Sequence, residues 1–246
     1  MIPMNRVCKQ SLARLLLAAT LSWATAVHAE GPGAMALQGY RLQDLGRGLY
    51  LVSDHTSQSM FMVYDRGVVV IDAPESFAVH LPQAIAEVTP NPVTHVIYTR
   101  SDTDHIGGVN ELGGQPVIIA QEETARVLER AADPRRPLPT VVFSEAYTLQ
   151  AGGMSLELSH QGDDSTPEST FVFAPLQRVL MIADLILPRS RPWRRFAVTR
   201  EPQGPPDTRL EAIRRLPWTR LVSSRPGETI DPADTGGACF REPCLY

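Results

Sequence analysis

The stretch THVIYTRSDTDHIGG, residues 94–108, decides the fold. It opens with the apolar run THVIYT (94–99), which has the length and composition of a buried strand. A polar cluster, Arg100 to His105, follows at once and leads into Gly107-Gly108. A strand that ends in polar side chains just before a Gly-Gly helix start is typical of α/β sites. We therefore expect a functional site at the carboxyl end of this strand.

Strand and helix patterns extend from this stretch in both directions. The chain predicts strands at 50–53, 59–64, 67–72, 94–99, 116–120, 147–150, 155–159, 170–174, 178–183 and 220–223. It predicts helices around Leu81, Ile85 and Val88, and at 106–112, 121–132 and 207–216. Strands followed by strand–helix units, repeated twice without a linker, predict two sheets packed face to face with helices outside.

The first 29 residues have the composition of a secretory signal peptide. Three basic residues and no acidic one accompany an apolar core, Leu15–Val27, and the segment ends in Val27-His28-Ala29. A buried N-terminal helix is the alternative. We expect cleavage after Ala29, a single domain over residues 30–246, and a periplasmic or secreted location.

Composition and charge exclude some classes of protein. The chain is 43% hydrophobic and 20% charged, which is ordinary for a globular domain. A formal charge of −4 argues against a broad nucleic-acid surface. Outside the leader, no apolar run has the length of a membrane span. We therefore expect a small molecule or a protein as partner.

Two cysteines, Cys239 and Cys244, lie close together near the C-terminus. In an exported protein this C-x4-C pair predicts a local disulfide. A metal site is the alternative, although no histidine follows His160.

Several stretches resemble the metallo-β-lactamase superfamily in order and spacing. These are VVVIDAP (68–74), HVIYT (95–99), DHIGG (104–108), the loop 162–167 and LMIADLILP (180–188). The resemblance covers nearly all of the chain after the leader. It implies an αββα four-layer sandwich and the activity of a zinc-dependent hydrolase.

The same resemblance implies a damaged metal site. The family's signature is H-x-H-x-D-H, and its Asp-His pair matches Asp104 and His105, while its bridging aspartate matches Asp184. The four remaining ligand histidines of the family match other residue types in this sequence, namely Arg100, Asp102, Ser165 and Arg225.

Ligand chemistry indicates how serious these replacements are. Zinc prefers imidazole, thiolate and some carboxylate, so Asp102 remains a possible ligand and Ser165 is a poor one. An arginine has no lone pair to donate. Two unit charges 4 Å apart interact by about 4 kcal/mol at an effective dielectric of 20, and a divalent ion faces roughly twice that repulsion. We expect no metal, or a single weakly bound divalent one.

The carboxylates of the motif then need another counter-charge. We expect Arg100, Arg225 or both to replace the metals by forming an ion pair with Asp102, Asp104 or Asp184. Arginines that turn outward to solvent are the alternative. Asp104 and His105 have a purely structural alternative, in which they cap the helix that follows.

Three functions from different classes remain open. The first is an exported metallo-β-lactamase-fold protein that hydrolyses nothing and binds a small molecule or a protein, and this is the function we favour. The second is a hydrolase of ester or lactam-like bonds with one metal held by Asp102, Asp104, His105 and Asp184, in which Asp104 is catalytic. The third is an accessory protein whose cleft is filled by its own side chains.

Overall fold

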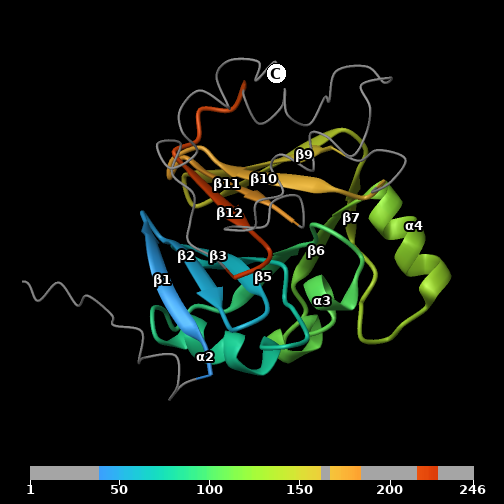
Figure 1. The fold of residues 1–246 in the computed structure, drawn as a ribbon, viewed down its shortest axis with the longest axis horizontal. Coiled ribbons are helices and arrows are strands. Elements are labelled where there is room, and N and C mark those ends of the chain that lie inside the picture. The colour runs from blue at the N-terminus through green and yellow to red at the C-terminus, as the bar shows by residue number, and fades with distance from the viewer. Residues whose placement is uncertain (1–38, 162–166, 184–214, 227–246) are drawn as a thin grey trace, which may run out of the picture. The chain divides into compact units, whose positions relative to one another are not determined.

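The computed structural model describes residues 39–161, 167–183 and 215–226, all within one compact unit, residues 32–246 (Figure 1). Several predictions fall outside the described residues. They are the leader 1–29, the cysteines Cys239 and Cys244, most of the helix 207–216, and the positions Ser165 and Asp184.

The first sheet contains seven strands in the order of the sequence. They are β1 (Arg41–Gly46), β2 (Leu49–Ser53), β3 (Gln58–Tyr64), β4 (Gly67–Ile71), β5 (Val93–Ile97), β6 (Val117–Gln121) and β7 (Val141–Phe143). Neighbours are antiparallel from β1 to β4 and parallel from β4 to β7. The carboxyl ends of β4 and β5 therefore lie side by side.

The second sheet contains five strands in the order β12-β11-β10-β9-β8. They are β8 (Ala146–Ala151), β9 (Met154–His160), β10 (Thr170–Ala174), β11 (Val179–Ile182) and β12 (Arg220–Ser223). Neighbours are antiparallel except β11 and β12, which are parallel.

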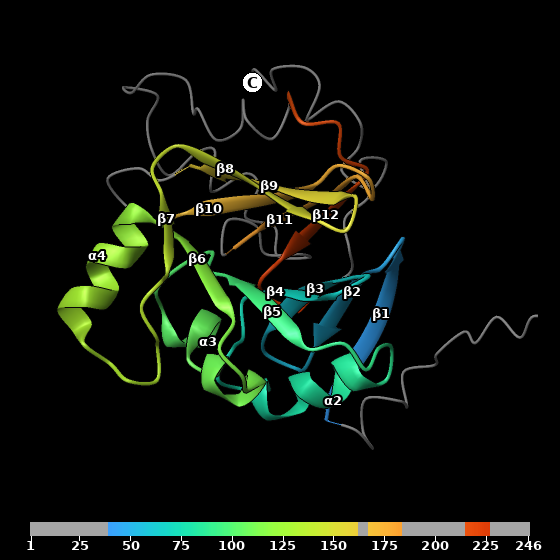
Figure 2. The same ribbon diagram turned by 180° about the vertical axis from the view of Figure 1, so that it is seen from behind.

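Apolar side chains join the two sheets face to face. One buried cluster takes Met60 and Val69 from the first sheet, and Leu158 and Met181 from the second. Full burial of each such side chain is worth about 1.5–3 kcal/mol, so this layer holds the sandwich together. Figure 2 shows the two sheets stacked, as the strand pattern predicts.

Short helices cover the outer face of the seven-stranded sheet. These are the 3₁₀ segment η1 (Ala78–His80), α2 (Leu81–Ala86), α3 (Thr103–Ile106), the 3₁₀ segment η2 (Val109–Leu112) and α4 (Glu122–Ala131). On the outer face of the five-stranded sheet, Trp218 packs on Phe171 and Leu180. Within the described part of the chain, no helix is long and apolar enough to cross a membrane.

The prediction of one helix over residues 106–112 is wrong. The chain instead forms α3, then turns at Gly107-Gly108, and continues as η2. A Cβ on Gly108 would lie 1.9 Å from the Cβ of Ala78. Gly108 therefore serves the close approach of η1 and η2, whereas a Cβ on Gly107 would lie 2.6 Å from the Thr103 carbonyl oxygen of α3.

Candidate functional site

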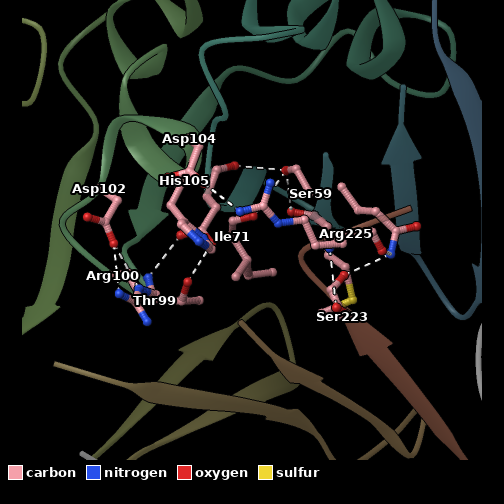
Figure 3. Close-up of polar contacts among 12 residues, drawn as sticks. Ser59, Ile71, Thr99, Arg100, Asp102, Asp104, His105, Ser223 and Arg225 are labelled. Carbon is pink, nitrogen blue, oxygen red and sulfur yellow. Dashed lines mark hydrogen bonds and ion pairs between the residues drawn. The ribbon is translucent and has the colours of Figure 1, made fainter. Parts of the chain in front are cut away.

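Segments from both sheets meet at one end of the sandwich (Figure 3). Asp72 follows β4, residues 99–105 follow β5, Glu168 precedes β10, and Arg225 follows β12. We call this group of residues the polar edge. The two sheets are also joined here by the backbone, because the Thr170 amide donates to the Thr99 carbonyl over 3.2 Å.

Arg225 and Asp104 form an ion pair across the polar edge. The Arg225 Nη2 donates to the Asp104 Oδ2 over 2.9 Å, and the two side chains are 42% and 46% exposed. Figure 3 shows the guanidinium reaching toward the side of Asp104 and His105. This ion pair is one of those expected from the sequence, and it joins residues that are 121 positions apart.

A side-chain amide from β3 shapes the turn that carries Arg225. The buried Gln58 Nε2 donates to the Ser223 carbonyl over 2.8 Å and to the Arg225 carbonyl over 2.7 Å. The Arg225 amide in turn donates to the Ser223 Oγ over 3.2 Å. The backbone of Arg225 is thus fixed by the first sheet, although it follows a strand of the second.

Arg100 and Asp102 form the second ion pair of the edge. The Arg100 Nε and Nη2 each lie 2.9 Å from the Asp102 Oδ2. The Arg100 side chain is only 17% exposed, whereas that of Asp102 is 47% exposed. Each of the two arginines therefore forms an ion pair with a carboxylate of the motif.

Asp72 is a fully buried residue of the polar edge that was not predicted from the sequence. The Asp72 Oδ2 lies 3.1 Å from the His105 Nδ1, and its Oδ1 accepts the Thr99 amide over 2.9 Å. Asp72 has a left-handed backbone, with φ of 60°. A carboxylate at Nδ1 fixes the orientation of the imidazole. The signal in the sequence that could have pointed to Asp72 is its position between the buried strand VVVI and Pro74.

Glu168 is the second missed residue. Its side chain is buried, and the Ser101 Oγ donates to its Oε1 over 2.9 Å. Its Oε2 has no hydrogen-bond partner among the residues that the structure describes. Burial raises the pKa of Glu168, the charge of Asp102 adds to this, and the Ser101 hydrogen bond and the Arg100 charge oppose it. Nothing near Glu168 in the sequence indicates these contacts, because Ser101 is 67 positions away.

Arg136 also contacts the loop after β5, at Ser101. Its Nη1 donates to the Ser101 carbonyl over 2.7 Å, and its Nε donates to the Asp133 Oδ2 over 3.1 Å. The side chain of Ser101 is therefore bound by Glu168, and its backbone carbonyl is bound by Arg136.

The helix-capping alternative for the motif is wrong. Helix α3 begins at Thr103, so Asp104 and His105 lie inside it, and its N-cap residue is Asp102. The Asp102 side chain makes no capping hydrogen bond. Further along the chain, His160 ends β9 and its Nε2 lies 2.7 Å from the Pro167 carbonyl oxygen.

The donor set of the polar edge does not fit a dinuclear zinc site. Asp102 and Asp104 are each paired with a guanidinium, which repels a divalent ion. His105 is the one imidazole of the motif, where zinc prefers several nitrogen or sulfur ligands. In the described segments, no three His, Cys, Asp or Glu side chains are grouped as a metal site.

Comparisons with known proteins agree with this architecture. Residues 53–228 match the family model described as the metallo-beta-lactamase superfamily. The chain superposes on a metallo-beta-lactamase from Pontibacter korlensis with a TM-score of 0.63 and 19% identity, covering 80% of this chain and 95% of that one. A Cronobacter sakazakii structure, titled as a metallo-beta-lactamase with a HARLDQ motif, gives 0.58 and 15%, covering 75% and 77%. The α/β sandwich predicted from the sequence is confirmed.

One curated relative is also similar. It is the 2,4-dinitroanisole O-demethylase subunit alpha of Nocardioides sp. (strain JS1661), 25% identical over 143 residues. The match takes in 56% of this chain and 44% of that protein, so the chain spans less than half of the length of this relative.

Proposed function

Because the chain belongs to the metallo-β-lactamase superfamily, we propose that it is an exported member that binds and does not hydrolyse. Its ligand is a small molecule or a protein, taken up at the polar edge. The observation that carries this proposal is the pairing of both exposed carboxylates of the motif, Asp102 and Asp104, with arginine. A zinc-dependent hydrolase needs these positions for metal ligands.

Electrostatics support the absence of dinuclear chemistry. Exposed ion pairs are worth about 0–1 kcal/mol, so a metal could break them at little cost. The arginine charges would still remain next to the metal, and the replaced imidazoles would still be missing. Structural zinc sites with full ligand sets are worth about 10–16 kcal/mol, and most of that free energy is lost here.

The alternative is a hydrolase with a single metal held by Asp102, Asp104, His105 and Asp184. One observation favours it: the buried Asp72 still orients His105, as a ligand histidine requires. The O-demethylation named for the Nocardioides relative is not proposed for this chain, which spans less than half of that protein.

Metal content separates the two functions. Protein purified without chelator is analysed for bound metals and then titrated with zinc, and hydrolysis of ester and lactam substrates is followed with zinc present. We expect far less than one zinc per chain and no turnover. Arg225→His alone does not restore a zinc site, because Arg100, Asp102 and Ser165 leave the first metal without imidazoles. One equivalent of zinc, with zinc-dependent turnover, would establish the alternative instead.

Binding is tested separately by thermal unfolding in the presence of candidate small molecules. A ligand that binds only the folded state at 100 times its Kd adds about 2.7 kcal/mol to the free energy of unfolding. A reproducible rise in Tm that is lost in Asp104→Asn would support binding at the polar edge. If no compound and no protein of the same compartment binds, the accessory function with a filled cleft becomes the better explanation.

A further inference from the structure

We propose that the Arg225 guanidinium is a built-in cation that neutralises Asp104, so that the polar edge is complete without any metal. This inference deepens the proposed function, on which it rests.

The first support is that Arg225 is positioned rather than merely nearby. Its turn is fixed by the two hydrogen bonds that the Gln58 amide donates to Ser223 and Arg225. The backbone N–H of Gln58 also donates to the Ser224 carbonyl over 2.8 Å. A cation whose backbone is fixed in advance loses less conformational freedom when it pairs with a carboxylate.

The second support is the charge around Asp104. Among the ion pairs of the described edge, Arg100 pairs with Asp102 and His105 pairs with Asp72, whereas Asp104 pairs with Arg225. The Arg225–Asp104 distance of 2.9 Å is that of a charge-assisted hydrogen bond.

The third support is that the pair joins elements of both sheets. Asp104 lies in α3, which packs on the first sheet, and Arg225 follows β12 of the second. A metal bound by ligands from both sheets would join the same elements. The guanidinium therefore supplies both the charge and the link.

Chemical rescue tests the inference without any metal. In Arg225→Ala, the side chain is removed and methylguanidinium chloride is added up to several hundred millimolar, because an exposed pair worth about 0–1 kcal/mol supports only weak binding of a free cation; sodium chloride at equal ionic strength is the control. We expect the variant to lose about 1–4 °C in Tm, the range for an exposed pair in a chain of this size. Methylguanidinium should restore part of this loss and shift the backbone amide signals of residues 103–105 in NMR spectra.

Three controls decide the outcome. The wild-type protein should not respond, because its own arginine fills the position. The double variant Asp104→Asn/Arg225→Ala should not respond, because the acceptor charge is gone. Arg126→Ala removes an exposed ion pair with Glu123 on α4 and should show no rescue.

Absence of any methylguanidinium effect in Arg225→Ala, or an equal effect in the double variant, overturns the built-in cation. Such a result leaves the proposed binding function standing. Stoichiometric zinc in the wild-type protein would overturn both. The two failures are therefore distinguishable.

Discussion

At the scale of single residues, the ionisation of Glu168 makes the stability of the protein depend on pH. Its carboxyl is buried, one oxygen accepts from Ser101, and the other has no partner in the described part of the chain. Burial raises its pKa above the ordinary 4.5. The folded protein thus binds this proton more tightly than the unfolded chain does. The stability from that proton is complete below the unfolded pKa and is lost as pH rises through the folded one.

Glu168→Gln removes this titration and keeps an oxygen that accepts from Ser101. We expect the free energy of unfolding of the variant, relative to wild type, to increase between pH 5 and pH 8. Urea unfolding at both pH values measures it, with Glu157→Gln as the control, because Glu157 is exposed on the neighbouring strand β9. A difference that does not change with pH would show that Glu168 is ionised at no cost.

At the scale of elements, the contact between η1 and η2 depends on one missing methyl group. A Cβ on Gly108 would overlap that of Ala78, and the Gly108 amide donates to the Ala73 carbonyl over 2.9 Å. We expect Gly108→Ala to cost about 1–3 kcal/mol, as overpacking does in a well-packed core.

The same contact provides its own control. Ala78→Gly removes the overlapping methyl group, so Gly108→Ala should cost less in that background. Gly113→Ala adds a Cβ with no atom within 4 Å, at a φ of 67°. It therefore reports backbone strain alone, of about 1–3 kcal/mol, because φ of 67° with ψ of −177° is a conformation that essentially only glycine adopts. If Gly108→Ala is equally costly with and without the Ala78 methyl, overlap is not the cause.

Elements with a clear hydrophobic pattern were predictable from the sequence. The buried runs at β4 and β10, and the parallel strand β12, appear where the pattern places them. The strands β1 and β7 were missed. RLQDLG alternates poorly, and VVF contains only three residues with one of them buried, so neither has the signal of an isolated strand.

Some residues of the candidate site were also predictable from the sequence, and others were not. Arg225, Asp104, Arg100 and Asp102 were found because the family resemblance supplied the alignment of distant positions. Asp72 and Glu168 were not found, because their roles depend on partners 33 and 67 positions away. Local composition carries no information about such contacts, which arise from the packing of the two sheets.

At the scale of the whole molecule, export and the C-terminal cysteines are one joint prediction. We expect the exported protein to begin at Glu30 and to contain a Cys239–Cys244 disulfide. The intact mass before and after reduction measures both, because reduction adds two hydrogen atoms. Two free thiols in protein taken from the oxidising compartment would contradict the disulfide, and an uncleaved leader would contradict export.

The Gln58 amide that holds the Arg225 turn has a consequence for the order of folding. It reaches a carbonyl 165 positions further along the chain. Contacts over such separations pay the largest loop-closure entropy and form late. A chain that emerges from its N-terminus completes β3 long before β12 exists to meet it. Within the described residues, we therefore expect the polar edge to assemble only after β12 has formed, so that a chain truncated before β12 lacks Arg225 and the contacts of its turn.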